Sequence, residues 1–234
     1  MMYPRGEKTS FFDRFWLEPL LLFSILYLPG YLTQTPDYNR DLFDSVSFNL
    51  LYGIITLPQI LFVIYLIYRR EPGAFKEYGI LPFRFRDTLS STGILLCIYA
   101  LMVPFFLILQ LFLSPGEQAL LQPGWQISRP ALLPLILATC LLTGYSEELF
   151  FRAYLLTTLE KAGLPHSLSI FTSVLLFGLG HIYQGFLSFI GTSFIGIILT
   201  FFFIKQKNLH TIGIAHGLYN FSVLLLSLAY IPGS

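Results

Sequence analysis

The chain has 234 residues, of which 55% are hydrophobic and only 12% are charged. Soluble globular domains carry about a quarter charged residues, so this composition excludes an ordinary water-soluble domain and predicts an all-α, polytopic bundle of membrane helices. The net charge of +1 gives no basis for a nucleic-acid partner, and membrane lipid is the expected surrounding.

Seven apolar segments approach the length of about 20 residues that a membrane helix needs. They are residues 15–33, 46–68, 90–113, 131–158, 167–183, 185–204 and 210–230. The first is interrupted by Pro19 and Pro29, so it is expected to lie partly in the interface. The fifth and sixth share a tight turn near Tyr183 and Gln184, and a different division gives one more helix. We therefore predict seven or eight membrane helices.

The placement of lysine and arginine predicts the topology, because these residues concentrate in cytoplasmic loops. With the N-terminus in the cytoplasm, only Arg40 and Arg129 of the 14 basic residues fall on the outer side. The sequence therefore predicts a multi-pass protein of the cytoplasmic membrane with its N-terminus inside.

Polar side chains are concentrated in the last four segments, where they are not expected. Each ionisable group at membrane depth costs about 2.5 to 3.5 kcal/mol on insertion scales. The residues concerned are Glu147, Glu148, Arg152, His181, His216 and Asn220. Glu18, in the first segment, is close enough to its start to reach the interface. Such a concentration indicates a functional site in the C-terminal half.

The two adjacent glutamates are predicted to have different roles. Glu148 and Arg152 are four residues apart, so they are neighbours on a helix and can neutralise each other in lipid. Glu147 points about 100° away and has no local partner. This suits a group that takes a proton from water and returns it. The alternative is that Glu147 ends a helix and faces lipid headgroups.

His181 follows Phe177 by four residues and lies next to two glycines. Gly178 and Gly180 remove side-chain bulk, so another helix can approach His181 closely. The alternative is a histidine at the membrane interface.

His216 and Asn220 are four residues apart and share one helix face. Two side-chain donors on one face can stabilise a developing oxyanion. Gly213 and Gly217 form a pair of small residues beside them, which favours a tight helix contact. The alternative is hydrogen bonding between helices alone.

In this order the three motifs resemble the CAAX prenyl endopeptidase and bacteriocin-processing family of membrane proteases, the CPBP or Abi family. Its pattern is Glu-Glu-x-x-x-Arg, then Phe-x-x-x-His, then His-x-x-x-Asn or Asp. The chain matches this pattern at Glu147, Glu148, Arg152, Phe177, His181, His216 and Asn220. Each motif alone is weak, but three on separate apolar segments in this order are specific. Residues 91–234 are therefore expected to form the protease core, with the motifs within 131–230, and residues 1–90 to form N-terminal membrane helices without a recognisable signature.

The resemblance implies an intramembrane endopeptidase whose substrates are membrane-associated peptides, prenylated or bacteriocin-like. It assigns water activation to Glu147 and His181, oxyanion stabilisation to His216 and Asn220, and structural support to Glu148, Arg152 and Phe177.

Two other functions compete with the peptidase. One is a bacteriocin-immunity or scaffold protein of the same family without catalysis. The other is a proton- or metal-coupled transporter, since buried Glu and His also build proton relays. Inverted repeats would favour a transporter, and the sequence has none that we can identify.

The sequence does not decide whether the protein uses a divalent metal such as zinc, and the resembled family is often labelled metalloprotease. Glu147, His181 and His216 offer one carboxylate and two histidines, which zinc can bind. They lack the two-histidine helix turn of soluble zinc peptidases, so a metal-free site is favoured.

Depth in the membrane poses a difficulty for this site. Counted along straight helices from their inner ends, His216 lies about 9 Å deep and His181 about 21 Å deep. If the two histidines act together, the start of segment 167–183 is expected to extend beyond the bilayer.

Overall fold

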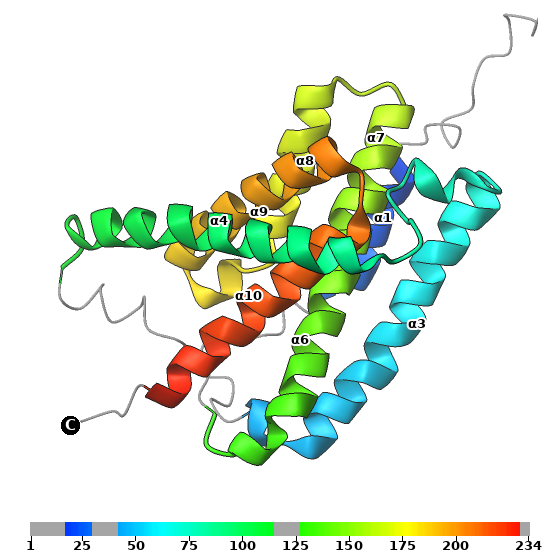
Figure 1. Cartoon of the computed structure of the whole chain (residues 1–234). Coiled ribbons are helices and arrows are strands. Elements are labelled where there is room, and N and C mark those ends of the chain that lie inside the picture. The colour runs from blue at the N-terminus through cyan, green and yellow to red at the C-terminus, as the bar shows by residue number, and fades with distance from the viewer. Residues whose placement is uncertain (1–16, 30–41, 115–126, 230–234) are drawn as a thin grey trace, which may run out of the picture.

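The computed structural model describes residues 17–29, 42–114 and 127–229, with the backbone alone for 227–229. Throughout this part of the chain the regular secondary structure is helical (Figure 1). The helices are α1 (Leu17–Leu26), α3 (Val46–Arg70), α4 (Phe85–Gln110), α6 (Leu133–Glu148), the π-helix η6 (Leu149–Leu156), α7 (Thr157–Lys161), α8 (His166–Leu179), α9 (Phe186–Gln206) and α10 (Leu209–Ala229). Short 3₁₀ turns are η2 (Leu42–Asp44), η3 (Ala74–Lys76), η5 (Pro130–Leu132) and η7 (Ile182–Gln184).

Five of the described helices are long and apolar enough to cross a membrane. They are α3, α4, the continuous helix Pro130–Lys161, α9 and the Leu209–Leu226 part of α10. The all-α prediction is confirmed. The predicted segments 15–33 and 167–183 instead give the shorter helices α1 and α8, of 10 and 14 residues, which fall below the length of a crossing. The described helices therefore do not show seven or eight membrane crossings, and residues 30–33 lie outside the described part.

The central element is α6, continued by η6 and α7. Helix α3 packs along one side of α6, α10 crosses its other side, and α8 packs on η6 and on α9. Helix α4 contacts α10 and α9 and runs crosswise to α3 and α6 (Figure 1). All eight residues of η6 are buried, so this segment is the middle of the apolar core.

The helical register changes directly after the two glutamates of the first motif. Helix α6 ends at Glu148, and the wider π-helix begins at Leu149. In a π-helix each N–H bonds to the carbonyl five residues earlier, and such turns occur frequently at functional sites. The change of register therefore coincides with the predicted site.

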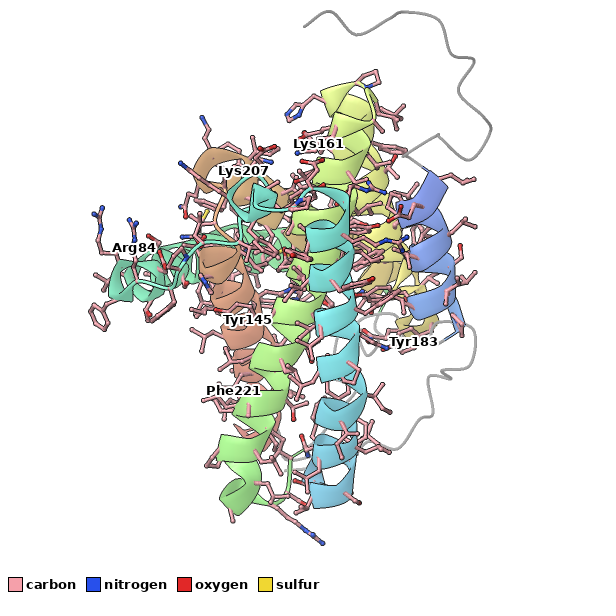
Figure 2. All side chains as sticks on the ribbon, turned by 90° about the vertical axis from the view of Figure 1, so that its right-hand side faces the viewer. Arg84, Tyr145, Lys161, Tyr183, Lys207 and Phe221 are labelled. Atoms are coloured by element: carbon pink, nitrogen blue, oxygen red, sulfur yellow. The ribbon has the colours of Figure 1, made fainter. Side chains whose placement is uncertain are left out.

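Two lysines that the topology prediction places in the cytoplasm lie close to each other in the structure. Lys161 at the end of α7 and Lys207 in the α9–α10 connection lie at the same end of the molecule (Figure 2). There Lys161 pairs with Glu71 and Glu77. The placement of this end in the cytoplasm stays a prediction.

Glycines bring α6 and α10 into backbone contact. A Cβ atom added to Gly144 would lie 2.5 Å from the backbone nitrogen of Gly217, and one added to Gly217 would lie 2.7 Å from the Cα of Leu141. A Cβ at Gly213 would meet the ring of Tyr145 at 3.1 Å. The tight contact predicted for Gly213 and Gly217 is therefore present.

We expect Gly217→Ala to lower the thermal unfolding temperature in detergent. The added methyl group meets helix backbone, which cannot move aside, and overpacking of this kind costs about 1–3 kcal/mol. Gly93→Ala on α4 is the matched control, because a Cβ there meets nothing within 4 Å. Equal unfolding temperatures for Gly217→Ala and the wild type would contradict the close contact.

Asp44 joins the start of α3 to the segment before α6. Its carboxylate accepts hydrogen bonds from the backbone N–H and hydroxyl of Ser128, both at 2.6 Å, and from the N–H of Arg129 at 3.1 Å. Burial by itself would raise the pKa of Asp44, but the hydrogen bonds from Ser128 and Arg129 outweigh it and hold the pKa below its usual value.

Because the pKa of Asp44 is lower in the folded protein than in the unfolded chain, its ionised form stabilises the fold. This stabilisation is fully present above the unfolded pKa of about 3.9. It is lost as the pH falls through the lower pKa of the folded protein. We therefore expect Asp44→Asn to unfold at a lower temperature than the wild type at neutral pH. The difference should shrink as the pH is lowered below about 4. Thermal unfolding of both proteins from pH 7 to pH 3 measures it, and a difference that stays constant would contradict the role given to the charge.

Candidate active site

The predicted site residues come from four elements that meet at the junction of α6 and η6. They are Glu147 and Glu148 at the end of α6, Arg152 in η6, Phe177 near the end of α8 with His181 just after it, and His216 and Asn220 in α10.

Arg152 and Glu148 form the expected ion pair between neighbouring turns. Arg152 Nη1 donates to Glu148 Oε1 at 2.8 Å, and both side chains are fully buried. Arg152 also donates to the carbonyl of Gly196 at 3.2 Å and to the hydroxyl of Thr200 at 3.3 Å. Its guanidinium lies 4.2 Å from the ring centre of Phe177. Every face of the guanidinium is thus occupied by protein, which suits a structural group.

His216 lies between the two glutamates. Its Nδ1 is 2.8 Å from Glu148 Oε1, and its Nε2 is 3.6 Å from Glu147 Oε2. Sequence spacing alone predicted no partner for Glu147, because the neighbour comes from α10 and not from its own helix. Glu147 Oε2 is buried and makes no hydrogen bond within the described part of the chain. The side chain of Glu147 as a whole is 20% exposed.

His181 and His216 both contact the ring of Phe177. The ring centres of His181 and His216 are each 5.6 Å from that of Phe177. The Nδ1–H of His181 donates to the carbonyl of Phe177 at 3.2 Å, which leaves Nε2 as a hydrogen-bond acceptor. Gly178 gives α9 room to approach, because a Cβ there would lie 2.0 Å from the hydroxyl of Ser193.

His181 and His216 meet at the Phe177 ring, although counting along straight helices placed them at different depths. Tyr145, two residues before Glu147, and Tyr183, two residues after His181, lie at similar heights midway along the bundle (Figure 2). The connection between α7 and α8 extends beyond the α9–α10 connection at the same end of the molecule (Figure 1). The extension of segment 167–183 beyond the bilayer stays a prediction.

Asn220 follows His216 by one turn of α10. Its side chain is half-buried and makes no hydrogen bond with the residues that the structure describes. It is thus available as a donor on the helix face that His216 occupies.

Comparison with known families agrees with these positions. The sequence model of the Rce1-like type II CAAX prenyl endopeptidase family matches residues 129–222. This segment is an Rce1-like domain. The resemblance inferred from the motifs is confirmed, and all seven motif residues fall inside the match. No match was found among curated proteins or among solved structures. The division of the chain near residue 90 stays a prediction.

The residues of the Rce1-like domain do not gather into a metal site. Within the described residues no three His, Cys, Asp or Glu side chains lie close enough together to hold a metal ion, and this includes Glu147, His181 and His216. We therefore derive no step through a metal.

Three tyrosines near Glu147 were missed by the sequence analysis. Tyr27 follows α1 and packs on Phe150 and Phe151. Tyr52 lies in α3 and is bonded to Thr143, one turn before Glu147, and Tyr183 lies in η7 two residues after His181. Tyr27 and Tyr52 lie outside the Rce1-like domain. Tyrosine is common in membrane proteins, so nothing in the local sequence marks these residues.

Proposed function

We propose that this protein is an intramembrane endopeptidase that hydrolyses peptide bonds of membrane-associated peptides, prenylated or bacteriocin-like. The observation that carries this proposal is the position of His216 between the buried Glu148 and the half-buried Glu147, with one oxygen of Glu147 that makes no hydrogen bond in the described part of the chain. Membership of residues 129–222 in a CAAX endopeptidase family supports the reaction class.

Glu147 is the general base of the proposed mechanism. It takes a proton from the attacking water while the water oxygen bonds to the peptide carbonyl carbon, and it returns the proton to the leaving amine. His181 assists, because its acceptor Nε2 can receive a hydrogen bond from the same water. The oxygen of Glu147 that lacks a partner is the atom available for this exchange.

His216 and Asn220 hold the oxyanion that forms on the peptide carbonyl. His216 faces Glu148 with Nδ1 and Glu147 with Nε2. In the protonated ring, Nε2–H is a strong donor to an oxyanion, and the side-chain amide of Asn220 on the same helix face is the second donor.

The test is purification in detergent with metal analysis, followed by cleavage of a peptide library whose members carry or lack a C-terminal lipid. Cleavage that depends on Glu147 supports the proposal, and persistence of cleavage after removal of bound metal supports the metal-free chemistry. A wild-type protein that cleaves no peptide, yet protects cells against a bacteriocin after Glu147→Gln, would indicate the immunity or scaffold role. Proton-linked solute uptake into liposomes that is lost in Glu147→Gln would indicate the transporter.

A further inference from the structure

The N-terminal helices bring hydroxyl groups to the active-site glutamate. Tyr52 of α3 is hydrogen-bonded to Thr143 of α6 at 2.9 Å. Thr143 lies four residues before Glu147, so both side chains point to the same face of α6. Thr139, two turns of α6 before Glu147, donates a hydrogen bond to Asn49 of α3 at 2.8 Å. A polar seam between α3 and α6 thus leads up to Glu147.

Tyr27, at the end of α1, reaches the same place from another direction. Its ring centre is 4.7 Å from that of Phe150 and 5.2 Å from that of Phe151. Tyr27 therefore packs on the first turn of η6, on residues three and four positions after Glu147.

Helix α1 is fixed at its other end. Glu18 pairs with Arg70 of α3 and accepts a hydrogen bond from the hydroxyl of Tyr154 in η6. The prediction that Glu18 merely reaches the interface is therefore incomplete, because this residue anchors α1 across the core.

We propose that Tyr27 and Tyr52 hold the attacking water against Glu147, so that helices outside the Rce1-like domain complete the active site. This inference rests on the proposed peptidase function. A water buried in protein needs two to four polar partners. Oε2 of Glu147, which makes no hydrogen bond in the described part of the chain, and the two tyrosine hydroxyls supply such partners.

The hydrogen-bonding capacities fit a water in this position. The hydroxyl of Thr143 lies 2.9 Å from both the Tyr52 hydroxyl and the carbonyl of Thr139. Its single proton can be donated to only one of them at a time. When Thr143 donates to Tyr52, the tyrosine proton can point to the water oxygen. The water then donates its two protons to Glu147 and to Nε2 of His181 and accepts from both tyrosine hydroxyls. On attack, the lone pair that accepted from Tyr27 bonds to the peptide carbonyl carbon instead. The proton passes to Glu147 and then to the leaving amine, so the hydrolysis balances.

Tyr52→Phe and Tyr27→Phe test this inference, because each removes one oxygen atom only. Loss of one neutral hydrogen bond to the reacting water should lower kcat about three- to tenfold. KM should stay unchanged, because the tyrosines bind water and not the peptide. In a Glu147→Gln background neither change should lower the residual rate further, because the water is no longer activated.

Two controls separate this role from helix packing. Thr139→Val breaks a hydrogen bond of the same α3–α6 seam two turns away from Glu147. Tyr99→Phe removes another intramembrane tyrosine hydroxyl, which is bonded to Ser222 on the α4–α10 contact. Both should leave kcat at the wild-type value even where they lower the unfolding temperature.

The outcomes distinguish this inference from the proposed function. An active wild type with unchanged kcat in both tyrosine variants would overturn the inference and leave the peptidase function intact. A loss of kcat equal to that in Thr139→Val would also overturn it, because loosened packing would then explain the effect. A wild type that cleaves no peptide would overturn both.

Discussion

Glu147→Gln is expected to lower turnover at least about a hundredfold, because general base catalysis contributes about 10² to 10⁴ in rate. Glutamine keeps the size of Glu147 and its place beside His216, but it cannot accept the proton of the water. KM should change little, because the base acts in the transition state. Single-turnover cleavage of a lipidated peptide by purified protein measures the effect. Cleavage at the wild-type rate by a purified Glu147→Gln protein would end the peptidase hypothesis as stated.

Substitutions of Asn220 and His181 test whether these residues act in the same step as Glu147. Asn220→Ala removes one oxyanion donor and should cost about 10² to 10³ in turnover. His181→Ala should resemble Glu147→Gln, and the double variant should be scarcely slower than either single one, as for residues that act as a unit. None of these changes adds charge to the membrane, so all the proteins should still insert. Multiplicative losses in the double variant would argue against a shared water.

Arg152→Ala is expected to destabilise the protein by about 3–5 kcal/mol, the typical cost of removing one partner of a buried ion pair. Glu148 would be left charged at a fully buried position, with only His216 beside it. Arg152→Ala also removes the hydrogen bonds from Arg152 to Gly196 and Thr200, which connect η6 to α9. Thermal unfolding in detergent measures the change, with exposure of the buried Cys140 thiol in a Cys97→Ser background as the signal.

Arg70→Ala is the matched control for this variant. Its partner Glu18 has 44% of its side chain exposed, so water can replace the lost cation and a much smaller shift is expected. If Arg152→Ala unfolds at the wild-type temperature and loses only turnover, Arg152 acts on substrate and the structural role is wrong.

The sequence alone determined the features that depend on neighbours along the chain. Long apolar segments predicted five of the described helices to within a few residues, because the bilayer fixes the length of a crossing. The Glu148–Arg152 pair followed from helical spacing, which requires no knowledge of other elements. The glycines of α10 indicated a close contact, and the order of the motifs indicated the family, which the match to residues 129–222 confirmed.

The tertiary structure decided what depends on elements far apart in the chain. It placed His216 between Glu147 and Glu148, a contact that spans 68 residues and follows from the glycine contact of α6 with α10. It brought the rings of His181 and His216 to the same Phe177 ring, each at 5.6 Å between centres. It also packed Tyr27 on Phe150 and Phe151 and bonded Tyr52 to Thr143, one turn before Glu147. Helical periodicity shows which face of a helix a residue occupies, but only packing determines which other helix covers that face.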